Sequence, residues 1–261
     1  MSSQLTDDIL VKFSQFINEH QTDVEPIKQF RDWFENHKNN TTHEEQVKMV
    51  DSCMLTLLFN FSQYDSPFTR EVHFMCVENL VFSNFYEDVF LENDSLKIDE
   101  QFALKCKELS DFPIEAFRPT RNIHLPRLEP SFEQLRSINN YKTPTEKVES
   151  IVNALKPVLY FDNTTTQMTC DDIIAVVSYI LCNAQSPLLY SNLCFIRDFD
   201  KGISTEGDFF VTQVEVAVQN ILGSQKEEMD RYMDEMVGGV ESKIVSSPPV
   251  SNANSQVKYC K

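Results

Sequence analysis

The amino-acid sequence predicts an all-α fold, in which an N-terminal helical bundle packs on a second, layered set of helices. The 261 residues include 20 Phe but only 5 Gly, a composition that suits helices packed through large side chains better than a turn-rich β fold. Apolar residues recur at three- and four-residue spacing along most of the chain, as amphipathic helices require. The length allows one large domain or two small ones with a buried core.

The first hundred residues carry a series of amphipathic segments, separated by polar breaks of ordinary helix-to-helix length. In the first segment, Ile9, Phe13 and Phe16 fall on one face, and Thr6 is placed to cap the helix start. In the third, Thr42 precedes two glutamates, which is a signature of a helix N-terminus. The expected helices span residues 6–20, 24–38, 42–61, 70–91 and 95–109.

A proline-rich segment, residues 117–130, separates these helices from those that follow. Pro119, Pro126 and Pro130 exclude a regular helix in this segment. We interpret its basic side chains as the solvated charges of an extended connector, with a binding patch as the alternative: Arg118, Arg121, His124 and Arg127.

Further helices are expected after the connector, at residues 131–138, 143–161, 169–184, 187–199 and 206–222. The second of these begins with Thr143 as the cap, Pro144 as the first helical residue and Glu146 in the first turn. From residue 237 the chain is rich in Gly, Ser, Pro and Asn, which predicts a disordered tail. We therefore divide the chain into a helical bundle (1–94), a helical core (95–236) and a tail (237–261).

The net charge of the chain limits its partners. A formal charge of -17 argues against binding to nucleic acid, because neutralising phosphates needs clustered Lys and Arg. It argues equally against electrostatic docking on anionic lipid. A protein partner with a basic or mixed surface is favoured instead, and low salt would then speed the association.

The cysteines and the hydropathy pattern predict a cytoplasmic protein. The 7 Cys form no CxxC pair and lie singly inside apolar runs, which is typical of reduced, packed thiols. The N-terminus has neither the basic region nor the long apolar core of a signal peptide. No apolar run approaches 18 residues, so we expect no transmembrane segment. We also expect a monomer.

Sequence motifs for covalent catalysis or cofactor binding are absent. There is no GxxxxGK[ST] phosphate loop and no HExxH, GxSxG or GxGxxG pattern. The 5 His lie apart from one another in the N-terminal half, where surface or packing roles account for them. We therefore expect no metal site, no cofactor and no enzyme of the hydrolase or oxidoreductase type.

The segment from Thr169 to Leu181 raises a different possibility, because two adjacent carboxylates open an otherwise apolar helix. Thr169 and Asp172 have the spacing of a capping box, and both acids lie where the helix dipole favours negative charge. The remainder of the segment is apolar nearly all round, which predicts a central buried helix. One acid is needed for capping. The other, Asp171, is then free to project toward a partner.

The C-terminal half carries a series of short motifs in a fixed order: Asp171-Asp172, Pro187, Ser191-Asn192-Leu193, Glu206-Gly207, Phe209-Phe210 and Thr212. This series resembles the catalytic core of the vacuolar protein sorting nine domain, the exchange factor for endosomal Rab GTPases. The segment "TPTEKVESI", at residues 143–151, is similar to the helix start that precedes the family's core. The resemblance covers roughly residues 45 to 222.

The resemblance implies a mechanism and a set of site residues. Asp171 would be an aspartate finger that enters the GTPase nucleotide site, competes for the phosphate-loop Lys and displaces Mg²⁺. The protein would perform no covalent chemistry and hold no cofactor of its own, and it would be recruited peripherally to early endosomes. The residues implied in GTPase binding are Asp172, Ala175, Ser191, Asn192, Phe209 and Thr212. Within this set, Asp172 would also cap the helix.

Four departures from the family pattern affect the expected rate and choice of GTPase. Phe209 replaces a Tyr whose hydroxyl contacts the GTPase, and Ala175 replaces a Pro one turn into the Asp helix. The loop at residues 197–208 is short, and Gly-Glu is reversed to Glu-Gly. A catalytically weak or inactive GTPase-binding scaffold is therefore the alternative function. A helical adaptor without any GTPase partner is the third hypothesis, in which both acids only cap.

Overall fold

The computed structural model describes residues 6–20, 24–37, 40–64, 68–90, 93–120, 128–160, 168–199 and 204–245. These residues form eleven α-helices, with short 3₁₀ turns, and contain no strand. The all-α fold expected from the sequence is confirmed.

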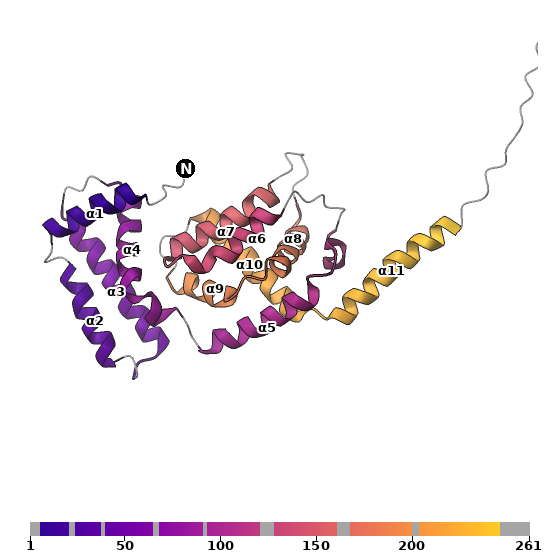
Figure 1. Cartoon of the computed structure of the whole chain (residues 1–261), viewed down its shortest axis with the longest axis horizontal. Coiled ribbons are helices and arrows are strands. Elements are labelled where there is room, and N and C mark those ends of the chain that lie inside the picture. Colours follow the sequence, from indigo (N-terminus) through magenta and orange to yellow (C-terminus); the bar gives the residue numbers. More distant parts are fainter. Residues whose placement is uncertain are drawn as a thin grey trace, which may run out of the picture. The chain divides into compact units, whose positions relative to one another are not determined.

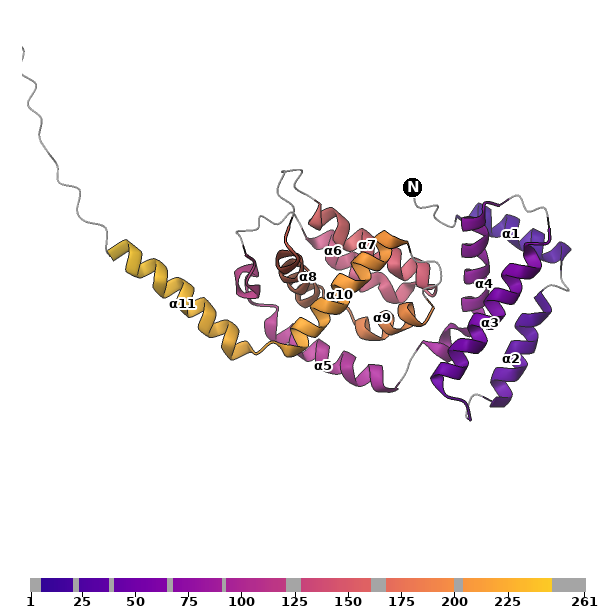
Figure 2. The same cartoon turned by 180° about the vertical axis from the view of Figure 1, so that it is seen from behind.

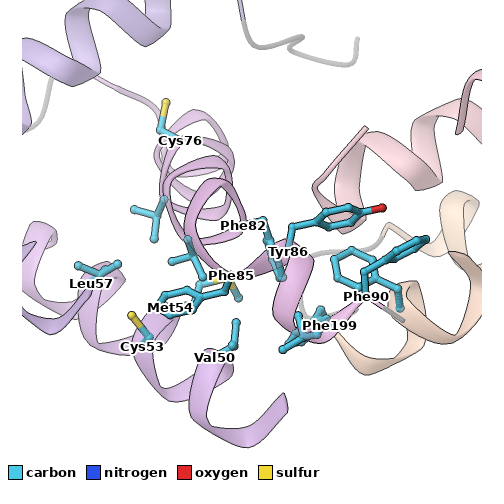
Figure 3. Packing of buried hydrophobic residues seen from close by; sticks show 14 of the residues in the cluster. Val50, Cys53, Met54, Leu57, Cys76, Phe82, Phe85, Tyr86, Phe90 and Phe199 are labelled. Atoms are coloured by element: carbon cyan, nitrogen blue, oxygen red, sulfur yellow. The ribbon is translucent and has the colours of Figure 1, made fainter. Parts of the chain in front are cut away.

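Four helices form the N-terminal group (Figure 1): α1 (Asp7–Glu19), α2 (Glu25–His37), α3 (His43–Phe61) and α4 (Arg70–Val89). Helices α2, α3 and α4 pack against one another, and α1 lies across one end of them. Val50, Met54 and Leu57 of α3 meet Phe85 of α4 in their apolar core (Figure 3). Stacked and edge-on aromatic rings fill much of this core, because Phe supplies large area at low entropic cost. Arg31 of α2 pairs with Asp88 of α4 at the rim.

Threonine side chains fix where many of the helices begin. Thr6, Thr42, Thr69, Thr143 and Thr169 each stand at an N-cap, and each hydroxyl accepts the backbone N–H three residues later. An N-cap bond satisfies a donor that the helix itself leaves unpaired, and it is worth about 1 kcal/mol. The caps predicted at Thr6, Thr42, Thr143 and Thr169 are confirmed.

The second group of helices surrounds α8, as the view in Figure 2 shows. It consists of α5 (Asn93–Leu109), η2 (Ile114–Phe117), α6 (Glu129–Arg136), η3 (Ser137–Asn140), α7 (Pro144–Leu159), α8 (Cys170–Ala184), α9 (Leu189–Asp198) and α10 (Thr205–Gly223). Helix α8 packs against α5, α6, α7, α10 and η2. The apolar side chains on several sides of α8 are therefore buried, as its composition predicts.

The two helical groups are joined by aromatic contacts between α4 and α9. Phe82 lies 5.2 Å from Phe195 and 4.9 Å from Phe199 between ring centroids. Phe195 also meets Tyr86 and Phe90 at 5.3 and 5.7 Å. Met1–Gly223 accordingly forms one compact unit and Ser224–Lys261 another. The division at residue 94 stays a prediction.

Helix α11 (Lys226–Val245) was not expected as a helix from the sequence. It runs past residue 237, where the predicted disordered tail begins, and it contains Gly238 and Gly239. Each glycine costs a helix about 1 kcal/mol relative to alanine, so the pair favours the disordered tail that the sequence predicts. Residues 246–261 of the predicted tail lie outside the described residues, as do residues 121–127 of the basic connector.

Within the described ranges, no single helix has the length and apolar character needed to cross a membrane. The pair α8 and α9, bent by 120°, meets that test of length and composition together.

Candidate functional site

The first turn of α8 is held by a complete capping box. The Thr169 hydroxyl accepts the backbone N–H of Asp172, and the Asp172 carboxylate accepts the backbone N–H of Thr169, both at 3.2 Å. The two bonds satisfy donors on both sides of the helix start and fix the orientation of the whole first turn.

Asp172 is further held by Thr120, near the start of the connector. Its Oδ1 atom accepts both the backbone N–H and the hydroxyl of Thr120, each at 2.8 Å. The side chain is completely buried. Burial raises the pKa of this carboxyl, but the hydrogen bonds from Thr120 and Thr169 outweigh burial and leave the pKa below its usual value. Asp172 is therefore an ionised structural group.

Asp171 has the opposite environment. It is exposed, and its carboxylate forms no hydrogen bond or ion pair with any described residue. Its backbone belongs to the rigid first turn of a helix whose next turns are buried. The neighbouring acids thus divide their roles in the way that the sequence suggests, with Asp172 used for capping and Asp171 projecting.

Ala175 lies one turn further along α8 and is 2% exposed. Its side chain packs inside the core, so in this conformation it forms no part of the outer surface. A direct role of Ala175 in GTPase binding stays a prediction, and the burial favours an indirect one through helix packing.

Ser191 is buried and belongs to an unusual helix start. The N-cap residue of α9, Leu188, supplies no side-chain cap. Asp99 of α5 supplies it instead, accepting the backbone N–H groups of Tyr190 at 2.7 Å and Ser191 at 3.1 Å. The Ser191 hydroxyl donates to the same carboxylate at 2.5 Å. Burial raises the pKa of Asp99, although these bonds oppose the shift.

Asn192 is also buried and connects three elements. Its amide donates to Asn139 of η3 and to the Leu188 carbonyl, both at 2.7 Å, while its Oδ1 accepts from Lys147 of α7 at 2.6 Å. Ser191 and Asn192 therefore position α9. Their implied role in binding a GTPase stays a prediction, and neither side chain reaches the surface in this conformation.

Lys147 is completely buried at the junction between the N-terminal helices and the core. Besides Asn192, its ammonium donates to the Tyr86 hydroxyl at 3.1 Å and the Ile138 carbonyl at 3.2 Å. It also lies 5.0 and 4.8 Å from the ring centroids of Tyr86 and Phe90. Burial lowers the pKa of Lys147 to about 7, against an opposing effect of the Glu146 charge.

Phe209 and Thr212 lie on the N-terminal half of α10. Phe209 is 37% exposed, and its ring contacts that of Phe210, which is buried. Thr212 is half-buried, and its hydroxyl accepts from Arg197 of α9 at 3.0 Å. Of the site residues that the resemblance implies, Asp171, Phe209 and Thr212 therefore reach the surface, whereas the other four are buried.

Helices α8 and α10, which carry the three accessible residues, pack directly against each other. Asn220 of α10 donates to the Ser178 hydroxyl of α8 at 3.2 Å and fixes their register. The two packed helices together carry a fixed acid and an exposed ring, side chains suited to binding a protein surface. In the described part of the chain, no group of three or more His, Cys, Asp or Glu could hold a metal ion.

Sequence reasoning missed four residues that hold this site: Asp99, Thr120, Lys147 and Arg197. Each acts on a residue far away in the sequence, so local patterns give little sign of them. Lys147 is the exception, because it stands four residues before the buried Ile151 and therefore on the inward face of its helix. A lysine at an apolar helix position was the available signal.

Comparison with known families gives one match. Residues 128–226 match the model of the vacuolar sorting protein 9 (VPS9) domain. A comparison with the curated proteins found no match. The matched segment extends from the N-cap residue of α6 through α10 and includes every site residue from Asp171 to Thr212. The match of residues 128–226 to the VPS9 model confirms the family resemblance seen in the sequence.

Proposed function

We propose that the protein is a guanine nucleotide exchange factor for a Rab GTPase of the endosomal Rab-five subfamily, and that Asp171 is its aspartate finger. VPS9 domains are exchange factors that act on GTPases. The observation that carries the finer assignment is the contrast between the two acids: Asp172 is buried with its oxygens engaged, whereas Asp171 is exposed and unengaged on the same rigid turn.

The chemistry of the proposed step is electrostatic. A carboxylate held at the phosphate-loop Lys and at the Mg²⁺ position removes both countercharges from the β-phosphate of GDP. A thousand-fold faster release requires about 4 kcal/mol off the barrier. A fixed carboxylate paired with an ammonium in a water-poor interface reaches this scale. The Mg²⁺ ion and the nucleotide belong to the GTPase, and the site of action would be the early endosome.

The test is release of a fluorescent GDP analogue from a panel of purified Rab GTPases, endosomal and non-endosomal. We expect the full-length protein to accelerate release from an endosomal member at least about a hundred-fold, which is about 3 kcal/mol. Acceleration restricted to non-endosomal members would contradict the assignment of the partner to the endosomal subfamily. If the folded protein accelerates none of them, the exchange function itself is wrong.

Phe209 favours a second candidate function, a GTPase-binding scaffold with weak exchange. The family resemblance places a Tyr hydroxyl at this position, and the exposed Phe209 ring cannot form that hydrogen bond. We expect Phe209→Tyr to raise kcat/KM for GDP release severalfold, because one added hydrogen bond is worth about 1 kcal/mol. Phe210→Tyr is the matched control, in a buried ring. An unchanged rate in Phe209→Tyr would show that the missing hydroxyl does not limit exchange.

A further inference from the structure

Arg197 of α9 holds one stripe of α10 through four hydrogen bonds. Its guanidinium donates to both carboxylate oxygens of Glu215 at 2.7 Å, to Asp208 at 2.6 Å and to the Thr212 hydroxyl at 3.0 Å. Asp208, Thr212 and Glu215 follow the i, i+4, i+7 spacing of one helix face. The two acids raise the pKa of Arg197, so the guanidinium stays charged throughout the working pH range.

The planar guanidinium suits this arrangement better than an ammonium does. Glu215 takes a two-point fork from Nε and Nη2, which fixes the plane of the group. With that plane fixed, the remaining N–H bonds point toward Asp208 and Thr212 in set directions. The side chain is about one third exposed, so the cluster lies at the surface rather than in the core.

The contact determines what the Thr212 hydroxyl can offer. A hydroxyl has one proton to donate and two lone pairs that accept. Arg197 occupies a lone pair, and the Thr212 proton has no acceptor among the described residues. The proton is therefore available to a group outside the chain.

The cluster also borders open space. Arg197 and Glu215 line a groove of about 540 Å³ between α9 and α10, together with Leu193, Cys194 and Val216. Val216 is exposed and lies one turn after Thr212 on the same helix. A partner that contacts Phe209 and Thr212 therefore meets the Arg197 cluster at the same face.

We propose that Arg197 is a positioning residue that presents Thr212 as a hydrogen-bond donor to the bound GTPase, whose matching group is a carbonyl or carboxylate oxygen. This inference rests on the proposed exchange function. Arg197 itself need not touch the partner. It acts by holding the Thr212 hydroxyl in one orientation before binding, which lowers the entropic cost of the contact.

The test is a double-mutant cycle on GDP release with Arg197→Gln, Thr212→Val and the combined variant. We expect each single change to lower kcat/KM about tenfold, equivalent to 1.4 kcal/mol, and the combined variant to be no slower than either. Thr212→Ser retains the hydroxyl and is expected to stay near the wild-type rate. Lys156→Gln is the structural control, because it removes the 2.7 Å ion pair between α7 and Glu206 of α10 but leaves the Arg197 cluster intact.

The outcomes separate the inference from the function on which it rests. Additive effects, or a Thr212→Val variant at the wild-type rate, would overturn the role of Arg197 while wild-type exchange still stood. A Lys156→Gln variant as slow as Arg197→Gln, with an equal loss of thermal stability, would make Arg197 a structural link only. A wild type that accelerates no GTPase would overturn the exchange function and this inference with it.

Discussion

Asp171→Asn is expected to reduce the acceleration of GDP release about a hundred-fold, to near the intrinsic rate, while leaving the fold intact. The change removes one negative charge and keeps the size of the side chain, so only the electrostatic competition for Lys and Mg²⁺ is lost. Asp171 is exposed and makes no bond within the described residues, so the free energy of unfolding should stay within about 0.5 kcal/mol of wild type. Stopped-flow release of fluorescent GDP and urea unfolding measure the two quantities.

Two further variants make the result specific. Glu133→Gln removes an exposed charge from α6 and should change neither rate nor stability. Asp172→Asn should mainly lower stability, whereas Asp171→Asn mainly lowers the rate of GDP release. We expect the free energy of unfolding to fall by about 2 kcal/mol, because the carboxylate bonds to Thr169 and Thr120 are weakened. If Asp171→Asn retains the wild-type rate, the finger assignment is wrong, and the helical adaptor in which both acids only cap gains support.

Lys147 is expected to make the protein more stable as the pH rises from 7 to 9. Its folded-state pKa of about 7 lies below the usual 10.5, so between these values the unfolded chain binds more protons than the folded one. The free energy of unfolding therefore increases with pH, by about 2 kcal/mol between pH 7 and pH 9. Lys147→Met should remove this increase, as measured by urea unfolding at several pH values.

Three other buried groups titrate mainly outside this interval. Burial raises the pKa of Glu78 on α4 to about 7, so the stability that its protonated form contributes is lost mainly between pH 4.5 and 7, with a small remainder just above pH 7. Burial raises the pKa of Cys53 to about 12 and of Cys76 to about 11, and these thiols reduce stability only above pH 9.

A matched control for the lysine is available. Lys142→Met removes a half-exposed lysine that lies 5.6 Å from the centroid of the same Tyr86 ring. In this variant the free energy of unfolding should increase with pH as much as it does in the wild type. An equal slope in wild type and Lys147→Met would show that Lys147 is charged in the folded state across this range.

Local patterns in the sequence were sufficient for the helices and for the separation of the two acids. Thr169 and Asp172 stand three residues apart, and the apolar stretch after them permits only a buried helix, so nothing distant was needed to interpret them. Helix α11 was missed because Gly238 and Gly239 are poor helix formers and the Ser-, Pro- and Asn-rich residues after them predict disorder.

The burial of Ser191 and Asn192 could not be predicted in the same way. Ser191 is held by Asp99, 92 positions away, and Asn192 by Lys147, 45 positions away. Such bonds depend on tertiary packing, which neither periodicity nor composition encodes. For Thr212 the sequence indicates a surface residue, but the partner of its hydroxyl, Arg197, becomes visible only once α9 and α10 are packed.

The cap that Asp99 supplies to α9 shows that the folded domain begins before the residues that match the family model. Asp99, Tyr86 and Phe82 all precede residue 128, the start of the VPS9 match, yet they hold Ser191, Lys147 and Phe195 within it. The limits of sequence similarity are therefore narrower than the cooperative folding unit. Substitutions in α4 and α5 should lower cellular activity by depleting the folded population, without touching any residue that meets the GTPase.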